Sequence, residues 1–107
     1  IRLGTLRGLG AVNHAKLGLF ETATRTYRAT ELTGDHEIAA LYGNITTLKG
    51  EVYLHTHACL SDVSCRAMGG HLNAATVSAT VEIIIDAWDA KVARAISDEV
   101  GLNLLML

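Results

Sequence analysis

Apolar residues recur along this chain in short runs that polar residues and glycines interrupt. Ten glycines and no prolines are spread over 107 residues, with no low-complexity tract, linker or internal repeat. The segments on either side of the polar stretch 21–24 predict a hairpin. A second predicted pair of strands, 36–48 and 51–60, is joined by a turn at Lys49 and Gly50.

The remaining segments add strands and leave room for one or two short helices. Residues 1–10 predict a short helix or a turn, because three glycines weaken a helix. Residues 71–88 are long enough for two elements, and their second half is rich in Val, Ile and Thr, which favour strands. In the tail, 89–107, apolar positions at helical spacing would fit a helix, whereas other residues would fit a turn. We favour a turn into a final strand. We therefore predict an α+β fold, a mainly antiparallel sheet with one or two short helices, as a single domain over residues 1–107.

The composition is richly apolar for a small protein. Half of the residues are apolar and 19% are charged, so we expect part of the apolar surface to lie against partner subunits. The net charge of −2 excludes a general basic field for nucleic acid. Only two cysteines occur, Cys59 and Cys65, and without a disulfide framework they favour a reducing, cytoplasmic setting. Neither a membrane span nor a signal peptide is visible, and because the first residue is Ile1 we expect that an upstream part has been removed or left out.

Two histidines stand one residue apart in the apolar run EVYLHTHACL, residues 51–60. Side chains on a strand alternate between faces, so His55 and His57 point the same way, roughly 6 to 7 Å apart along the strand. If the chain turns near Ser64 and returns, His71 falls opposite His57, with about 5 Å between β-carbons. Three imidazoles then converge, and zinc takes three protein nitrogens where its fourth position stays open for water or substrate.

The pattern around the third histidine agrees with a metal site but leaves two alternatives open. Gly69 and Gly70 provide a backbone with the freedom of a ligand-bearing loop before His71. In the first alternative, the H-x-H pair is only a half-exposed polar face. In the second, the chain is a cupin, which also has H-x-H on a strand, with a carboxylate near the position of Asp62. A cupin requires a proline-glycine turn, and because the chain has no proline we reject it.

Five segments occur in the order and rough spacing of the plants-and-prokaryotes-conserved (PPC) domain: GAVNHAKLGLF, HEIAALYGNI, GEVYLHTHACLSD, GGHL and VSATVEIII. The chain resembles this family over nearly its whole length, most specifically in H-x-H, GGHL, Thr80 and Glu82. The resemblance implies an α/β domain on a mainly antiparallel sheet that assembles as a homotrimer. It also implies a DNA-binding or regulatory role and a divalent metal, for which we expect zinc, on His55, His57 and His71.

Two departures from the family bear on function. The family usually has another strand and helix upstream, so we expect this chain to lack them. Plant relatives contact DNA through a separate AT-hook, an Arg-Gly-Arg core flanked by proline that enters the minor groove, and this chain has none. Glu21 and Glu31 lie among five basic residues of the first quarter of the chain, which favours ordinary solvated charges over a phosphate-binding patch. The five are Arg2, Arg7, Lys16, Arg25 and Arg28.

Three further residues are candidates for chemistry near the histidines. Glu82 either orients a ligand imidazole or occupies an exposed position on an edge strand, and Asp62 is the other nearby carboxylate. Cys59 shares the predicted face of the H-x-H pair, yet a buried cysteine more often acts as a small hydrophobe. No G-x-S-x-G or G-x-x-x-x-G-K motif is present, so covalent and nucleotide-driven catalysis are not supported.

Three functional hypotheses therefore remain. We favour a non-enzymatic binding module, a homotrimer with a three-histidine metal site that acts in regulation, with DNA or a regulatory protein as its partner. The alternative is a metal-dependent enzyme that acts on a small molecule through a metal-bound water. The third hypothesis is DNA binding by the domain itself, and the net acidic charge argues against it. We predict no catalytic residue and no membrane partner.

Overall fold

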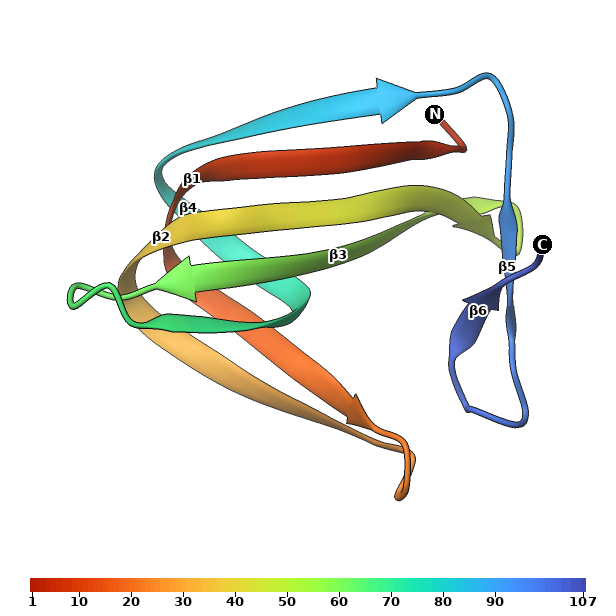
Figure 1. The fold of residues 1–107 in the computed structure, drawn as a ribbon, viewed down its shortest axis with the longest axis horizontal. Coiled ribbons are helices and arrows are strands. Elements are labelled where there is room, and N and C mark those ends of the chain that lie inside the picture. Colours follow the sequence, from red (N-terminus) through yellow and green to blue (C-terminus); the bar gives the residue numbers. More distant parts are fainter.

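The computed structural model describes residues 1–107 as six β-strands and the turns between them. The strands are, in chain order, β1 (Gly4–Glu21), β2 (Thr26–Leu48), β3 (Glu51–Ser61), β4 (Ala67–Ala87), β5 (Ala93–Ile96) and β6 (Asn103–Leu105). Three of them, β1, β2 and β4, have 18, 23 and 21 residues, whereas strands usually have about 5 or 6. Each long strand bends as it crosses the molecule (Figure 1).

The first four strands pair in a closed antiparallel circuit. β1 pairs with β2, β2 with β3 and β3 with β4, and β4 returns to pair with β1. Register shifts in β1, between Gly8 and Gly10 and between Val12 and His14, accompany the bend, because a bulge increases the local twist of a strand. Gly10 has a φ of 143°, and a side chain there would collide with the backbone of Thr80 in β4. The bend therefore depends on this glycine.

β5 and β6 extend the sheet beyond the end of β2. β5 runs parallel to β2 and pairs with Thr47 and Leu48, and β6 pairs with β5 in the antiparallel sense. In Figure 1 the two short strands lie where β2 ends and β3 begins. The pairing of β5 with β2 places Arg94 opposite Leu48, a residue far before it in the sequence.

The core is small because the molecule is thin. Its extents are 41 × 37 × 17 Å, and only 14 of the 107 residues are buried. Nine apolar residues of β1, β2 and β3 form the core cluster: Leu6, Val12, Ala15, Leu17, Ile38, Leu41, Ile45, Ala58 and Leu60. Much apolar surface remains exposed as a result, including a run of isoleucines on β4.

The predicted α+β class is wrong, because the structure contains no helix. Residues 1–10, predicted as a short helix or a turn, mostly belong to β1, and residues 71–88, predicted to hold two elements, lie almost entirely in β4. Both errors have one cause: pairing with strands far along the chain satisfies the backbone hydrogen bonds, and this outweighs local propensity. With no helix, the chain also has none that could cross a membrane.

The predicted turns are confirmed. β1 and β2 are joined at residues 22–25, and β2 and β3 at Lys49 and Gly50, where φ is 51° and 82°. In the tail, the Ser97 N–H donates a hydrogen bond to the Leu102 carbonyl, and the Gly101 N–H donates one to the Ser97 carbonyl. The tail therefore turns into the short final strand β6, as the turn residues predicted.

Candidate metal centre

One hairpin carries the three histidines. His55 and His57 share a face of β3, and His71 on β4 is the direct register partner of His57. The pairing confirms the register predicted from a turn near Ser64, because the strands close through Ser61 and Ala67. Three imidazoles from two adjacent strands thus meet on one side of the sheet.

The ring nitrogens lie at distances that suit a shared ion. Nε2 of His57 lies 3.3 Å from Nε2 of His55, and one ligand atom from each of the three rings lies within 4.8 Å of the others. The ring centroids are 5.1, 5.3 and 5.6 Å apart. Two nitrogens bound to one tetrahedral zinc at about 2.05 Å are roughly 3.3 Å apart. The donor set and its spacing therefore fit a three-histidine zinc site.

The surroundings of His55 and His71 favour the neutral imidazole, the form in which a histidine can bind a metal. Burial lowers the pKa of His55 below its usual value, and the positive charge of Arg94 and the neighbouring rings of His57 and His71 lower it further. Burial, followed by the proximity of His57, also lowers the pKa of His71. A positive charge on either of these two rings would be repelled by its surroundings, so the lowered pKa values leave both rings free to bind an ion.

Gly69 and Gly70 do not form the predicted loop, because both lie within β4. A β-carbon on Gly70 would stand 2.8 Å from the carbonyl oxygen of Gly18 in β1. Glycine is required here for close packing of β1 against the residue that precedes His71, rather than for an unusual backbone conformation. The third ligand is thus held by a rigid strand.

The histidines line a cavity of about 640 Å³, which we call the histidine cavity. Tyr27 and Tyr53 contribute aromatic walls, and Phe20 and Leu102 are among its apolar residues. The Tyr27 ring meets the His71 ring edge to face, with centroids 6.0 Å apart. None of the residues that line this cavity is an aspartate or a glutamate. A metal on three histidines would keep one coordination position for a ligand from this space.

Arg94 is the residue of this cavity that the sequence analysis missed. It is 8% exposed, and its guanidinium lies over the Tyr53 ring, 5.1 Å from the centroid. Its Nη2 donates a hydrogen bond to Oδ1 of Asn44, which is the register partner of His55. Alternation along β2 could have placed Asn44 opposite the histidines, but nothing in the spacing of residues predicts that β5 crosses beside β2.

The other candidate residues lie outside the histidine cluster. Asp62 is at the end of the hairpin turn, where its Oδ1 accepts hydrogen bonds from the backbone N–H groups of Ser64 and Arg66. Glu82 is exposed and lies opposite Leu9 of β1. Cys59 is half-buried and free, and its sulfur is not among the converging ligand atoms. Neither carboxylate is placed to serve as a base beside the histidines.

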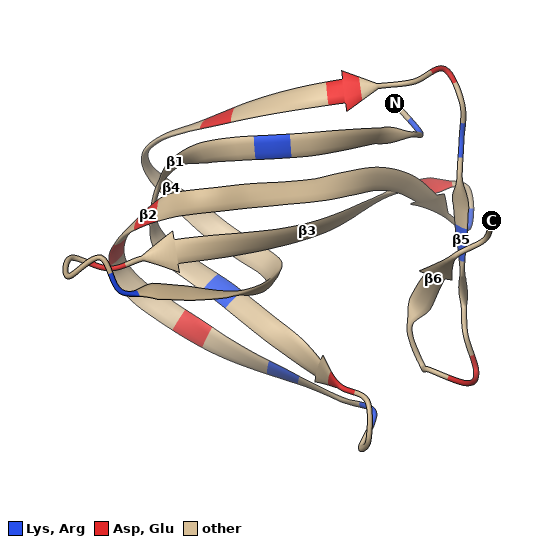
Figure 2. Cartoon of the chain, viewed as in Figure 1, with Lys and Arg blue, Asp and Glu red and all other residues tan.

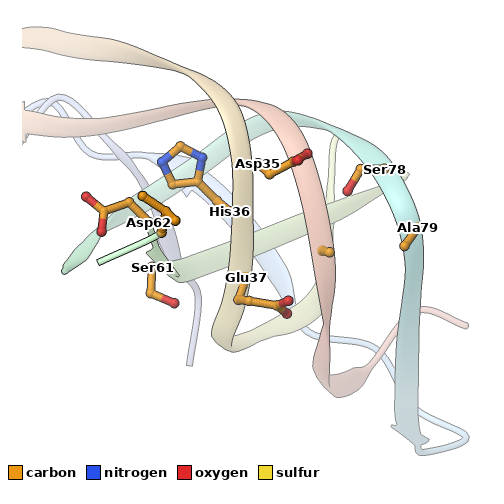
Figure 3. A pocket seen from close by; sticks show the side chains of 9 residues that line it. Asp35, His36, Glu37, Ser61, Asp62, Ser78 and Ala79 are labelled. Atoms are coloured by element: carbon orange, nitrogen blue, oxygen red, sulfur yellow. The ribbon is translucent and has the colours of Figure 1, made fainter. Parts of the chain in front are cut away.

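A second cavity, of about 480 Å³, gathers acidic residues at the other end of β3. We call it the acidic cavity, and its polar residues are Asp35, His36, Glu37, Ser61, Asp62 and Ser78. Figure 3 shows that its carboxylates do not converge on one point, since Asp35 and Glu37 lie on β2 and Asp62 lies in the turn after β3. His36 is held by a hydrogen bond between its Nδ1 and the Gly34 carbonyl oxygen, 2.8 Å long. No metal-ligand group is formed here.

The basic residues of the first quarter do not form a phosphate-binding patch. Arg7 pairs with Asp86 and Arg28 with Glu21, each at 2.8 Å, and Arg25 donates a hydrogen bond to the Glu99 carbonyl. In Figure 2 the Lys and Arg positions are scattered over the sheet among Asp and Glu positions. The interpretation as solvated, locally paired charges is supported.

Comparisons with known proteins agree with the fold and show the family. No curated protein matches the chain. A solved structure from Bacteroides thetaiotaomicron, described as a "putative DNA binding protein", is 28% identical and has a TM-score of 0.96, over 99% of this chain and 74% of that one.

Two archaeal structures are similar to the same extent. One, a metal-containing protein from Archaeoglobus fulgidus, is 28% identical with a TM-score of 0.92, over 100% of this chain and 76% of that one. The other, a plant- and prokaryote-conserved (PPC) protein from Pyrococcus horikoshii, is 28% identical with a TM-score of 0.91, over 100% of this chain and 74% of that one. The family described as the Plants and Prokaryotes Conserved (PCC) domain matches residues 1–89. The chain belongs to this family.

Proposed function

We propose that the chain is a non-enzymatic, metal-binding module that acts in regulation as a homotrimer, with zinc on His55, His57 and His71. The convergence of three imidazole ligands on one face of a rigid hairpin carries this proposal. Zinc suits the site because it accepts three histidine nitrogens and leaves one position open. The metal-containing archaeal relative adds support from outside the chain. Both cysteines are free, which fits the proposed cytoplasmic setting.

The alternative, a metal-dependent enzyme, has less support. Hydrolytic metal sites usually pair a metal-bound water with a general base within hydrogen-bond reach. The histidine cavity has no acidic residue in its lining, and Asp62 and Glu82 stand outside it. The site can bind and orient a ligand, but it offers no carboxylate to move a proton.

The proposed homotrimer rests on the exposed part of β4. From Leu72 to Ala87 this strand pairs with β1 alone, so its other edge is open. Ile83, Ile84 and Ile85 are 45%, 55% and 45% exposed, which leaves apolar side chains on both faces of this edge. Open, apolar edges of this length are otherwise sites of aggregation, and a symmetric contact with partner copies would cover them.

Metal analysis tests the ligand set. Protein purified without chelator is expected to carry about one zinc per chain, and His57→Ala is expected to carry almost none, because two histidines cannot complete the site. His14→Ala is the matched control, since His14 lies outside the cluster. Equal metal content in wild type and His57→Ala would reject the site.

Light scattering on a sizing column tests the trimer. Wild type is expected at three times the chain mass of 11.4 kDa, and Ile84→Glu is expected to shift toward a single chain, because a charge would be buried in the contact. Ile96→Glu is the control, since Ile96 is at least as exposed, at 62%, but lies on β5. A single-chain mass for wild type would contradict the trimer.

The regulatory partner is tested by a gel-shift titration across salt, with Arg25 and Arg28 changed to Ala. Because the structure from Bacteroides thetaiotaomicron is described as a "putative DNA binding protein", DNA is the first candidate. Binding that weakens with salt and falls in the double variant would identify DNA as the partner. No binding at physiological salt would exclude DNA and leave a regulatory protein.

A further inference from the structure

Arg94 is a buried cation without a counter-charge. Its side chain stands in the lining of the histidine cavity and the residue is 8% exposed. The four ion pairs of the structure all involve other residues. Burying an unpaired charge is costly, so buried arginines normally face a carboxylate or a phosphate. Here that anion is not supplied by the chain.

The guanidinium is held in place by neutral acceptors only. Its Nε donates to Oγ1 of Thr46, its Nη1 to the carbonyl oxygen of Asn103 and its Nη2 to Oδ1 of Asn44, each at 2.9 Å. A guanidinium has five N–H groups, so two remain after these three bonds. The three fixed bonds and the Tyr53 ring beneath the group orient it, and preorganised donors of this kind bind anions well.

The residues that line the histidine cavity also restrict which ligand it can bind. A divalent metal on the three histidines would bring two more positive charges into a space that already contains Arg94 and has no acidic residue in its lining. The rest of the wall is largely apolar and aromatic, and the volume of about 640 Å³ is in the range of small-molecule sites, roughly 300 to 1,000 Å³. The cavity thus favours a molecule with an anionic head and an apolar body.

We propose that the histidine cavity binds a small organic carboxylate whose head group lies between the metal's open position and Arg94, and whose apolar body lies along Phe20, Tyr53 and Leu102. This inference rests on the proposed metal site and names the class of molecule that it recognises. A regulatory module of this kind responds to a metabolite acid, and the metal and Arg94 select the negative charge while the aromatic wall selects the body.

Binding to cobalt-loaded protein tests the proposal, with benzoate as the anion and benzamide as its neutral analogue of the same shape. Cobalt content is measured first, and binding is followed by calorimetry and by the visible absorption of the cobalt. Benzoate is expected to bind at least about tenfold more tightly than benzamide and to change the cobalt spectrum, because a hydrogen bond to a charged group is worth roughly ten- to a hundredfold. Metal-free protein is expected to lose most of this preference.

Two variants assign the preference to Arg94. Arg94→Gln is expected to weaken benzoate binding about tenfold or more without changing the cobalt content, and Arg94→Lys to restore part of it. Arg7→Gln is the control, because Arg7 is exposed and pairs with Asp86. If Arg94→Gln does not fold, the comparison of benzoate with benzamide on wild type still decides the question. Cobalt-loaded wild type that binds both equally would overturn this inference alone, whereas wild type that holds no cobalt on the histidines would overturn the metal site as well.

Discussion

The two cavities at opposite ends of β3 differ in what their titratable side chains can do together. The histidine cavity has three ligand nitrogens within 4.8 Å of one another, on two strands whose register is fixed. The acidic cavity has three carboxylates, yet they point in different directions and one of them is tied to its own turn. Composition alone would rank the acidic cavity as the better cation site. Convergence of ligand atoms, which depends on strand register, reverses that order.

The largest expected difference between the cavities is in zinc-dependent stability. Zinc at a hundred times its dissociation constant should stabilise the wild type by about 2.7 kcal/mol, and His71→Ala should abolish the effect, because the ion then has too few ligands. Asp62→Ala should leave it intact. Urea unfolding with and without zinc measures this, and a response in His71→Ala equal to that of wild type would remove the distinction between the cavities.

A smaller effect is expected from the packing behind the histidine cavity. Gly70→Ala should destabilise the protein by about 1–2 kcal/mol, because the new β-carbon would lie 2.8 Å from the Gly18 carbonyl oxygen. Gly69→Ala is the matched control, since its nearest backbone oxygen is 3.1 Å away, on Ala58. Urea unfolding of both variants should rank Gly70 as the more sensitive, and the reverse ranking would show that β1 does not press on this strand.

The smallest expected effect on stability comes from the carboxylate of Asp62 in the acidic cavity. The backbone N–H of Arg66 is the main cause that lowers the pKa of Asp62 below its ordinary value. Burial opposes this shift, but the backbone N–H of Ser64 and the Arg66 side chain lower the pKa further. Because the folded-state pKa is the lower one, the ionised carboxylate stabilises the fold above the unfolded-state pKa, near about 3.9, and this contribution is lost as the pH falls through the folded-state pKa.

Asp62→Asn should therefore be less stable than wild type at pH 7, and the gap should close in strongly acidic solution. Urea unfolding at several pH values measures it. Glu37→Gln is the control from the same cavity, because Glu37 takes part in none of the four ion pairs, and this variant should differ little from wild type in stability. A gap for Asp62→Asn that is independent of pH would assign the role of Asp62 to shape rather than charge.

The three-histidine cluster could be predicted from the sequence because its geometry depends only on neighbouring segments of the chain. Period-two alternation puts His55 and His57 on one face, and one turn near Ser64 fixes which residue faces His57. The family resemblance pointed to the same three residues. Each of these inferences involves a single hairpin, where register follows from the turn.

The rest of the site and much of the fold could not be predicted, because they depend on pairings between distant segments. Arg94 reaches the histidine cavity only through the parallel pairing of β5 with β2. The short helix or turn predicted at residues 1–10 and the two elements predicted at 71–88 are replaced by single long strands, because β1 and β4 pair along almost their whole lengths. No spacing rule over a short window contains these contacts.

The location of all three ligands on one hairpin has a consequence for how the protein matures. Ligands gathered from distant segments can meet only after the chain has closed long loops, whereas a short loop costs little entropy to close. His55, His57 and His71 come together as soon as β3 and β4 pair around the turn at Ser64. An ion bound at that stage would hold β3 and β4 together before β1 pairs with β4. Metal supply in the cell would then affect the yield of folded protein as well as the fraction of sites that hold metal.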